Sequence, residues 1–117
     1  MSAYGKPVYL DSIKEDFIGK GLFDLKKRCE YGIGNYLPDA KIEDLASSIQ
    51  AVLEDCVLKI MSEARKVSKN LVYSGGVALN CVANSKIANM FENIWIMPNP
   101  GDAGSSLGCA SLLLKKQ

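Results

Sequence analysis

Apolar positions recur at steps of three and four residues through the middle of the chain, a pattern typical of an amphipathic helix packed on a core. These positions are Ile42, Leu45, Ala46, Ile49, Val52, Leu53, Cys56, Ile60, Ala64 and Val67. Asp39 follows a proline and is a candidate N-cap, and basic residues at 65–69 suit the C-terminal end. The pattern predicts a long helix that follows a cap at Asp39, carries the apolar stripe as far as Val67 and ends by Asn70.

Two short apolar runs follow this helix, at 71–73 and 94–97, and the segment 77–90 between them is compatible with a helix. Strands joined by a helical crossover are normally parallel, and strands that are apolar on both faces are typical of a sheet covered on both sides. We therefore expect two parallel strands, with Trp95 in the core. After a loop at 101–106, residues 107–116 are expected to form a last helix.

The first 38 residues are rich in glycine and tyrosine, and their apolar periodicity is too broken to predict a long element. Loops with short strands or turns are expected there, including a turn at 3–7 in which Gly5 tolerates positive φ. The order of elements indicates an α/β protein, with residues 1–117 forming a single lobe around a partial parallel sheet. Such a sheet should have an edge that lacks a partner.

Composition narrows the class of protein. A chain of 117 residues that is 48% hydrophobic and 23% charged is typical of one globular domain. Fourteen basic and 13 acidic residues leave a net charge of +1, so we expect no nucleic-acid or membrane partner. The longest apolar runs, such as 112–114, are too short for a bilayer span, and a cytoplasmic location is the simplest expectation.

The chain contains no histidine, so neither a Ser-His-Asp triad nor a histidine zinc site can be complete within it. Its cysteines, Cys29, Cys56, Cys81 and Cys109, lie far apart and form no C-x-x-C pair. They are expected to be free and mostly buried thiols, as is usual in a reducing compartment.

Two loops carry the candidate chemistry. Ser74-Gly75-Gly76 follows the first strand, at the sheet end where ligands bind in open α/β folds, and its glycines would let a flat group touch the backbone. Asn80 follows in the expected helix, where its amide can face a nucleotide. Asp102 follows the second strand and should emerge at the same sheet end. On the residues alone, a structural turn and an N-cap for the last helix stay open and are favoured over a ligand site.

The stretch 74–81, Ser-Gly-Gly-Val-Ala-Leu-Asn-Cys, followed by 100–108, Pro-Gly-Asp-Ala-Gly-Ser-Ser-Leu-Gly, resembles the O-carbamoyltransferases of the Nod-factor and antibiotic-tailoring family. Segments 3–7 and 44–50 also look like that family. The resemblance implies the second lobe of a ribonuclease H-like, actin-type ATPase domain. It also implies a YrdC-like domain that makes carbamoyl-adenylate from ATP and carbamoyl phosphate, before the actin-type domain transfers the carbamoyl group to a hydroxyl.

The resemblance further implies residue roles. The residues that match the adenosine-binding motif, for ATP or carbamoyl-adenylate, are Ser74, Gly75, Gly76, Val77 and Asn80. Asp102 matches an aspartate that holds a divalent metal, iron in this family, with two histidines of the other lobe. The implied partners are therefore that missing N-terminal lobe and the YrdC-like domain of the same polypeptide, a nucleotide and a hydroxyl-bearing acceptor. No catalytic residue is assigned in this chain, and the isolated chain is expected to be inactive and prone to self-association.

Two other functions remain in competition. The equivalent lobe of a tRNA threonylcarbamoyl transferase is expected to have Asp-Asn-Gly or Asp-Asn-Ala after the second strand, whereas residues 102–104 are Asp-Ala-Gly. A stand-alone binding or interaction module would keep the fold without chemistry. The reading frame on either side of the chain would distinguish that module from a part of a longer enzyme.

Overall fold

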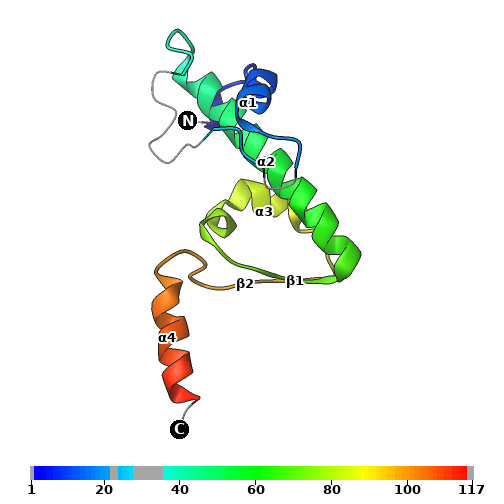
Figure 1. Ribbon diagram of the computed structural model, residues 1–117, viewed down its shortest axis with the longest axis vertical. Coiled ribbons are helices and arrows are strands. Elements are labelled where there is room, and N and C mark those ends of the chain that lie inside the picture. The colour runs from blue at the N-terminus through cyan, green and yellow to red at the C-terminus, as the bar shows by residue number, and fades with distance from the viewer. Residues whose placement is uncertain (1, 22–23, 28–35, 116–117) are drawn as a thin grey trace. The chain divides into compact units, whose positions relative to one another are not determined.

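The computed structural model describes residues 2–21, 24–27 and 36–115 (Figure 1). It falls into two compact units, Met1–Ile60 and Met61–Gln117. In chain order the elements are η1 (Ser2–Tyr4), α1 (Leu10–Phe17), α2 (Ile42–Val67), β1 (Asn70–Tyr73), η2 (Gly76–Leu79), α3 (Cys81–Ile87), β2 (Asn93–Ile96) and α4 (Gly104–Leu114). The prediction of a mixed α/β chain is confirmed. The prediction that the chain forms a single lobe stays a prediction.

The long helix α2 runs over Ile42–Val67, as its apolar periodicity predicted. Acidic residues lie in its first turn and basic residues in its last, where each complements the partial charge of the helix end. The predicted N-cap is wrong, because Asp39 lies in a turn that ends before the helix begins at Ile42. The apolar stripe, and not that cap, was the reliable signal for this element.

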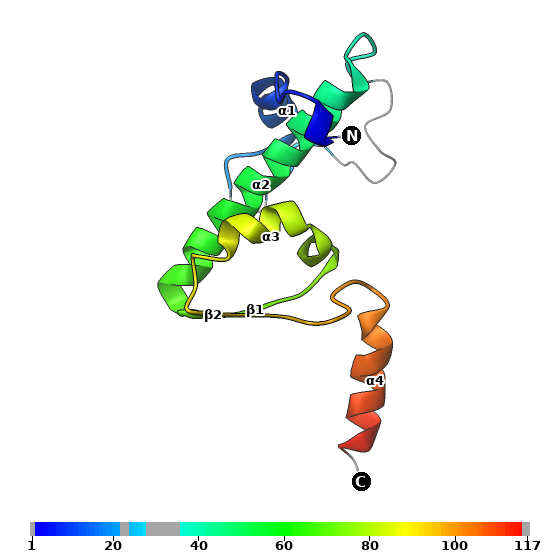
Figure 2. The same cartoon turned by 180° about the vertical axis from the view of Figure 1, so that it is seen from behind.

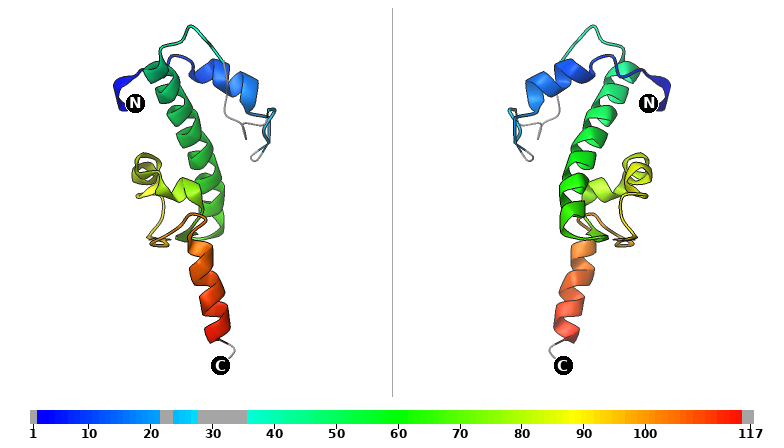
Figure 3. Two further views of the ribbon diagram at one scale, coloured as in Figure 1. Left: turned by 90° about the vertical axis from the view of Figure 1, so that its left-hand side faces the viewer. Right: turned by 90° about the vertical axis from the view of Figure 1, so that its right-hand side faces the viewer.

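In the first unit, residues 10–17 form the helix α1, where the broken periodicity had predicted only loops, turns and short strands. Figures 1 and 3 show α1 beside the N-terminal part of α2. Ser48 of α2 is completely buried, and its Oγ accepts a hydrogen bond from the Tyr9 backbone N–H at 3.0 Å. The same hydroxyl donates to the carbonyl of Asp44 at 2.7 Å. A contact between distant parts of the sequence thus holds the chain immediately before α1.

The predicted turn at residues 3–7 is present as η1 and the bend at Gly5, but for a different reason. An added Cβ at Gly5 would overlap the main-chain carbonyl of Glu43, so the position needs glycine for space. Positive φ does not explain it, because Gly75 is the glycine with positive φ among the described residues. The neighbouring Lys6 backbone N–H donates to the Asp44 carboxylate at 2.7 Å.

The second unit is built around the predicted crossover. β1 and β2 are parallel and pair in register from Asn70 with Asn93 to Tyr73 with Ile96. The chain between them passes through η2 and α3, which cover one face of the strand pair (Figure 2). The buried side chains of this unit include those of Met61, Tyr73, Ala78, Ala83, Ile87 and Phe91. The predicted helix over 77–90 is shorter than expected, since the α-helical part is Cys81–Ile87.

The other face of the strand pair exposes apolar side chains in the described structure. Val72 and Trp95 are register partners and are 73% and 56% exposed. The expectation of a sheet covered on both sides, with Trp95 in the core, is therefore wrong for the described residues. Alternation along each strand puts Val72 and Trp95 on the face opposite the buried Tyr73.

The last helix, α4, begins at Gly104, three residues earlier than predicted, and all of its residues from Ser105 onward are exposed. Within the described part of the chain, no helix is long and apolar enough to cross a membrane. A helix as apolar as α4 normally lies buried against other structure.

Three of the four cysteines lie among the described residues, and Cys56, Cys81 and Cys109 are free thiols, as predicted. The expectation that they are mostly buried is wrong, because Cys81 and Cys109 are exposed and Cys56 is half-buried. Cys29 lies outside the described residues.

Candidate functional site

The two chemistry-bearing loops lie side by side at the carboxyl end of the strand pair. The Gly75 backbone N–H donates to the Pro100 carbonyl at 2.8 Å, and Ser74 Oγ donates to the same carbonyl at 3.3 Å. Figure 2 shows the chain leaving β1 and β2 at the same end. The prediction that the glycine loop and the aspartate loop open at one rim of a parallel sheet is confirmed.

A cleft of about 330 Å³ opens between these loops. The first loop contributes Ser74 and Gly75 to its lining, and the second loop contributes Asp102. The remaining lining residues are Met97, Pro100, Gly101, Gly104 and Ser105. Met97, Pro100 and Ser105 were not predicted as site residues, although Pro100 and Ser105 lie within the motif at 100–108. Pro100 matters because its carbonyl accepts hydrogen bonds from both Gly75 and Ser74 and so joins the two loops. This contact is visible only in the structure.

Gly75 has a backbone conformation that only glycine adopts readily. Its φ of 102° and ψ of 164° lie in a region that side chains with a Cβ avoid. Space is not the reason, because no atom lies within 4 Å of an added Cβ at either Gly75 or Gly76. The backbone of this turn is therefore strained for other residues and open above, as the approach of a flat group requires.

Asn80 is the N-cap of α3, which differs from its predicted place inside a helix. Its backbone is extended, with φ of −79° and ψ of 93°, and its Oδ1 accepts a hydrogen bond from the Ala83 backbone N–H at 3.1 Å. Val77, which is 42% exposed, Gly76 and Asn80 are not among the residues that line the cleft. The structure thus places Ser74 and Gly75 with Asp102, whereas the other three predicted site residues lie in η2 or at its end.

Asp102 does not cap the last helix. The N-cap of α4 is Ala103, and no side chain makes a capping hydrogen bond there. Asp102 is exposed, and its carbonyl accepts a hydrogen bond from the Ser105 N–H at 3.1 Å. The N-cap role that the bare sequence favoured is therefore wrong, and Asp102 instead lines the cleft.

A metal bound at Asp102 would need ligands from elsewhere. Among the described residues, no three His, Cys, Asp or Glu side chains lie close enough together to hold a metal ion. The exposed carboxylate of Asp102 suits one oxygen ligand of a divalent cation, while catalytic metal sites typically use about three protein ligands. The residues present fit one part of a metal site and not a complete one.

Tyr73 lies at the end of β1, directly before Ser74, and is 9% exposed. Burial raises the pKa of its phenol, because the charged phenolate is poorly solvated there. Its hydroxyl has no hydrogen-bond partner among the described residues, and the same holds for Asn84 Oδ1. Tyr73 is therefore a neutral group at physiological pH and is not a candidate base.

The chain matches a known protein family over a range that includes both loops. Residues 13–111 match a family model described as the carbamoyltransferase N-terminus. Because this match covers most of the chain, the chain belongs to the carbamoyltransferase family.

Several bacterial proteins are similar in sequence to this chain. An uncharacterized protein of Synechocystis is 34% identical over 137 aligned residues, covering 94% of this chain and 22% of that protein. Nodulation protein NolNO of Sinorhizobium fredii is 35% identical over 75 residues, which cover 61% of this chain and 11% of that protein. Nodulation protein U of Azorhizobium caulinodans is 29% identical over 85 residues, with 67% of this chain and 15% of that protein covered. The chain spans less than a quarter of the length of these relatives.

Proposed function

We propose that this chain is the nucleotide-binding lobe of an O-carbamoyltransferase, with the ribonuclease H-like, actin-type fold of that family. In the proposed reaction, the carbamoyl carbon of carbamoyl-adenylate forms a bond to an acceptor hydroxyl oxygen. The bond between that carbon and the phosphate oxygen breaks, AMP leaves with the electron pair, and the hydroxyl loses its proton. The chain itself binds and orients the adenylate.

The observation that carries this proposal is the shared cleft. Gly75 exposes its backbone on one side and Asp102 presents a carboxylate on the other, in a cleft large enough for part of a nucleotide. Neither loop alone is specific, since glycine turns and exposed aspartates are common. Their union at the carboxyl end of parallel strands, in a chain of this family, supports an adenylate site.

In this proposal Asp102 supplies one oxygen ligand to a divalent metal, and two histidines of the remaining polypeptide complete the site. When bound, such an ion would supply Lewis-acid chemistry to the transfer reaction. The free carboxylate of Asp102 and the absence of any complete ligand cluster among the described residues both support a site shared with another part of the polypeptide.

The exposed apolar surface of the second unit also supports the proposal that other parts of the polypeptide pack against this chain. Val72, Trp95 and the leucines of α4 would lie against the first lobe and YrdC-like domain that we propose for the full-length enzyme. Without those parts, the same surface should cause the isolated chain to self-associate. Sedimentation at micromolar concentration tests this, and a monomer that binds no apolar dye would contradict it.

The decisive experiment is Asp102→Asn in the full-length enzyme that contains this chain. The amide keeps the size of the side chain but weakens a metal contact worth several kcal/mol, so we expect carbamoyl transfer to fall about 100-fold or more. Asp39→Asn, at an exposed turn outside the cleft, is the matched control and should leave the rate unchanged. Equal transfer rates in Asp102→Asn and the unmodified enzyme would refute the assignment.

Asn80 requires a finer design, because it caps α3. Asn80→Ala removes both the cap oxygen and the amide, whereas Asn80→Ser keeps a capping oxygen and removes only the amide. If the amide binds nucleotide, both variants raise the nucleotide KM. If Asn80 is only a cap, Asn80→Ala alone lowers stability, and Asn80→Ser behaves like the unmodified enzyme.

The tRNA threonylcarbamoyl transferase alternative receives no support from the carbamoyltransferase family match or from the Asp-Ala-Gly sequence at 102–104. The stand-alone module is tested by the same full-length enzyme. A complete reading frame that encodes only these 117 residues, together with a chain that binds no adenine nucleotide, would favour the module.

A further inference from the structure

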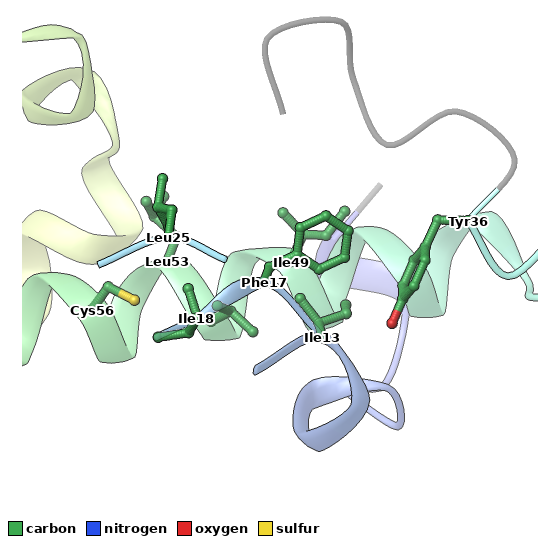
Figure 4. A pocket seen from close by; sticks show the side chains of 9 residues that line it. Ile13, Phe17, Ile18, Leu25, Tyr36, Ile49, Leu53 and Cys56 are labelled. Atoms are coloured by element: carbon green, nitrogen blue, oxygen red, sulfur yellow. The ribbon is translucent and has the colours of Figure 1, made fainter. Parts of the chain in front are cut away.

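The first unit contains an apolar pocket whose lining includes no residue of the loops at 74–81 and 100–108. It has a volume of about 330 Å³, and its lining includes Phe17 of α1 and Ile49 and Leu53 of α2. Tyr36 lies at one end of the pocket and Cys56 at the other, with the sulfur directed toward Ile18 (Figure 4). This volume lies at the lower end of the range of small-molecule pockets, which begins at about 300 Å³.

The tyrosine end of this pocket is held in place. The Tyr36 ring packs edge-to-face on Phe17 at 5.1 Å between centroids, and its hydroxyl donates to Asp16 Oδ2 at 2.8 Å. The Tyr36 hydroxyl therefore already has its hydrogen-bond partner on α1. The lining that remains is almost wholly apolar, so it selects for an apolar group.

A second pocket of about 300 Å³ adjoins the first and shares Ile18 and Cys56 with it. This second pocket is lined by three lysines, Lys14, Lys26 and Lys59. The first pocket is apolar and the adjoining one, which we call the cationic pocket, is lined by lysines. Both pockets lie within the first unit.

The cationic pocket has more positive than negative charge. Asp55 Oδ2 accepts from both Lys14, at 2.8 Å, and Lys59, at 3.1 Å, so two ammonium groups share one carboxylate. Hydrogen bonding from Lys14 holds the pKa of Asp55 below its ordinary value, so the carboxylate stays ionised. Lys26 Nζ donates to the main-chain carbonyl of Glu15, a neutral partner. Three lysines and the two carboxylates of Glu15 and Asp55 leave a net charge of +1 on this lining.

We propose that the first unit binds a small amphipathic anion, with an apolar chain against Phe17, Ile49 and Leu53 and an anionic head group at Lys26. Burial of the chain would supply most of the affinity, because lysines open to solvent attract an anion only weakly. The lysines would instead determine selectivity for a negative head group and the direction in which the chain enters. Carboxylate and phosphate head groups share this chemistry.

The proposal is tested with three probes that have the same alkyl chain, used below their micelle-forming concentrations: decanoate, decyl phosphate and decyltrimethylammonium. Two-dimensional NMR of the 117-residue chain, at a concentration where sedimentation shows a monomer, should show decanoate or decyl phosphate shifting the amides of Ile18, Leu53 and Cys56. The preferred anion identifies the head group. Equal affinity for decyltrimethylammonium, or shifts confined to the second unit, would overturn the proposal.

Two pairs of variants distinguish the contribution of the apolar pocket to binding from that of the lysines. Lys26→Gln should weaken decanoate binding about five-fold and leave decanol binding unchanged, whereas Lys20→Gln, at an exposed lysine outside the pocket, should change neither. Ile49→Gln should weaken both ligands about ten-fold. Its control is Ile42→Gln, at an exposed position of the same helix outside the pocket. An unchanged decanoate affinity in Lys26→Gln and Ile49→Gln would contradict the site.

Cys56 provides a second measurement because it lies where the two pockets meet. Bound decanoate should slow alkylation of Cys56 by iodoacetamide at least several-fold, read by mass spectrometry of its peptide. Cys81 and Cys109 are exposed thiols of the second unit and serve as internal controls that should react at unchanged rates. Protection of all three thiols alike would indicate nonspecific association and overturn the proposal.

Discussion

The two compact units are held together in different ways. In the first unit, polar side chains of α2 hold the N-terminal segment: Asp44 accepts from Lys6, Ser48 from Tyr9, and Asp55 from Lys14. In the second unit, two parallel strands pair in register, and small and apolar side chains are buried beneath α3.

This difference explains why the sequence reveals one unit better than the other. The contacts that shape the first unit join residues about 40 positions apart, as in the pair Tyr9 and Ser48. The second unit follows a strand, turn, helix and strand in sequence, each with its own local pattern. Motifs therefore identify the cleft at Gly75 and Asp102, whereas the lysine pocket of the first unit has no motif.

The largest expected effect on stability is a cavity in the second unit. Ile87 is 1% exposed, so Ile87→Ala should lower the free energy of unfolding by about 2–5 kcal/mol. Leu79→Ala, at a side chain that is 65% exposed, is the control and should change it by about 0.5 kcal/mol or less. Urea denaturation followed by circular dichroism measures both. Similar losses in the two variants would show that this unit does not depend on its buried side chains.

The next effect comes from the backbone of the glycine turn. Gly75→Ala should cost about 1–3 kcal/mol, because its φ of 102° is unfavourable for alanine. Gly76→Ala has equally open space around the added Cβ but no positive φ, and should be nearly neutral. The same denaturation measurement compares them, and equal stability of the two variants would contradict the strain that we assign to Gly75.

A smaller effect is expected from the polar contact in the first unit. Ser48→Ala removes the acceptor of the Tyr9 N–H and should destabilise the chain by about 1 kcal/mol. Ser47→Ala is the neighbouring control on the same helix. Hydrogen exchange of the α1 amides provides a local readout, which should accelerate in Ser48→Ala. Equal exchange rates of the α1 amides in the two variants would show that the contact between Ser48 and Tyr9 does not stabilise α1.

The smallest effect is the dependence of stability on pH through Asp55. Its pKa is lower in the folded chain than the ordinary value of 3.8, so its stabilising contribution is present above that value. The contribution is lost as pH falls through the lower folded-state pKa. Because the ion pairs are partly exposed, we expect less than about 1 kcal/mol.

Asp55→Asn should accordingly lose less stability than the unmodified chain when the pH is lowered from about 7 to about 3. Asp39→Asn, at an exposed turn, is the control and should keep the full acid dependence of the unmodified chain. An acid titration of the urea midpoint distinguishes them. Parallel titration curves for all three proteins would show that Asp55 does not contribute to the pH dependence of stability.

Residues with a strong periodic pattern were predicted well. The stripe from Ile42 to Val67 predicted the long helix α2, since a buried helix face repeats at helical spacing wherever it packs. The strand pair was also predicted, because short β-prone runs joined by a crossover have few other arrangements. Trp95 shows the limit: its residue type indicated the core, but its exposure depends on what covers the sheet.

The candidate site was predicted in its position and not in its details. The order of strands and loops brings Gly75 and Asp102 to one rim, which requires no knowledge of side-chain packing. The role of Asn80 as a cap and the release of Asp102 from capping depend on where α3 and α4 begin. One residue of difference at a helix start changes the role of a polar side chain.

The amino-acid sequence by itself determined α2, the parallel strand pair and the meeting of two loops, because each follows from a repeat or an order along the chain. Only the tertiary structure decided that α1 is a helix, that Val72 and Trp95 are exposed, and that three lysines adjoin an apolar pocket. Those features arise from contacts between residues far apart in sequence, whose free energies no local pattern contains.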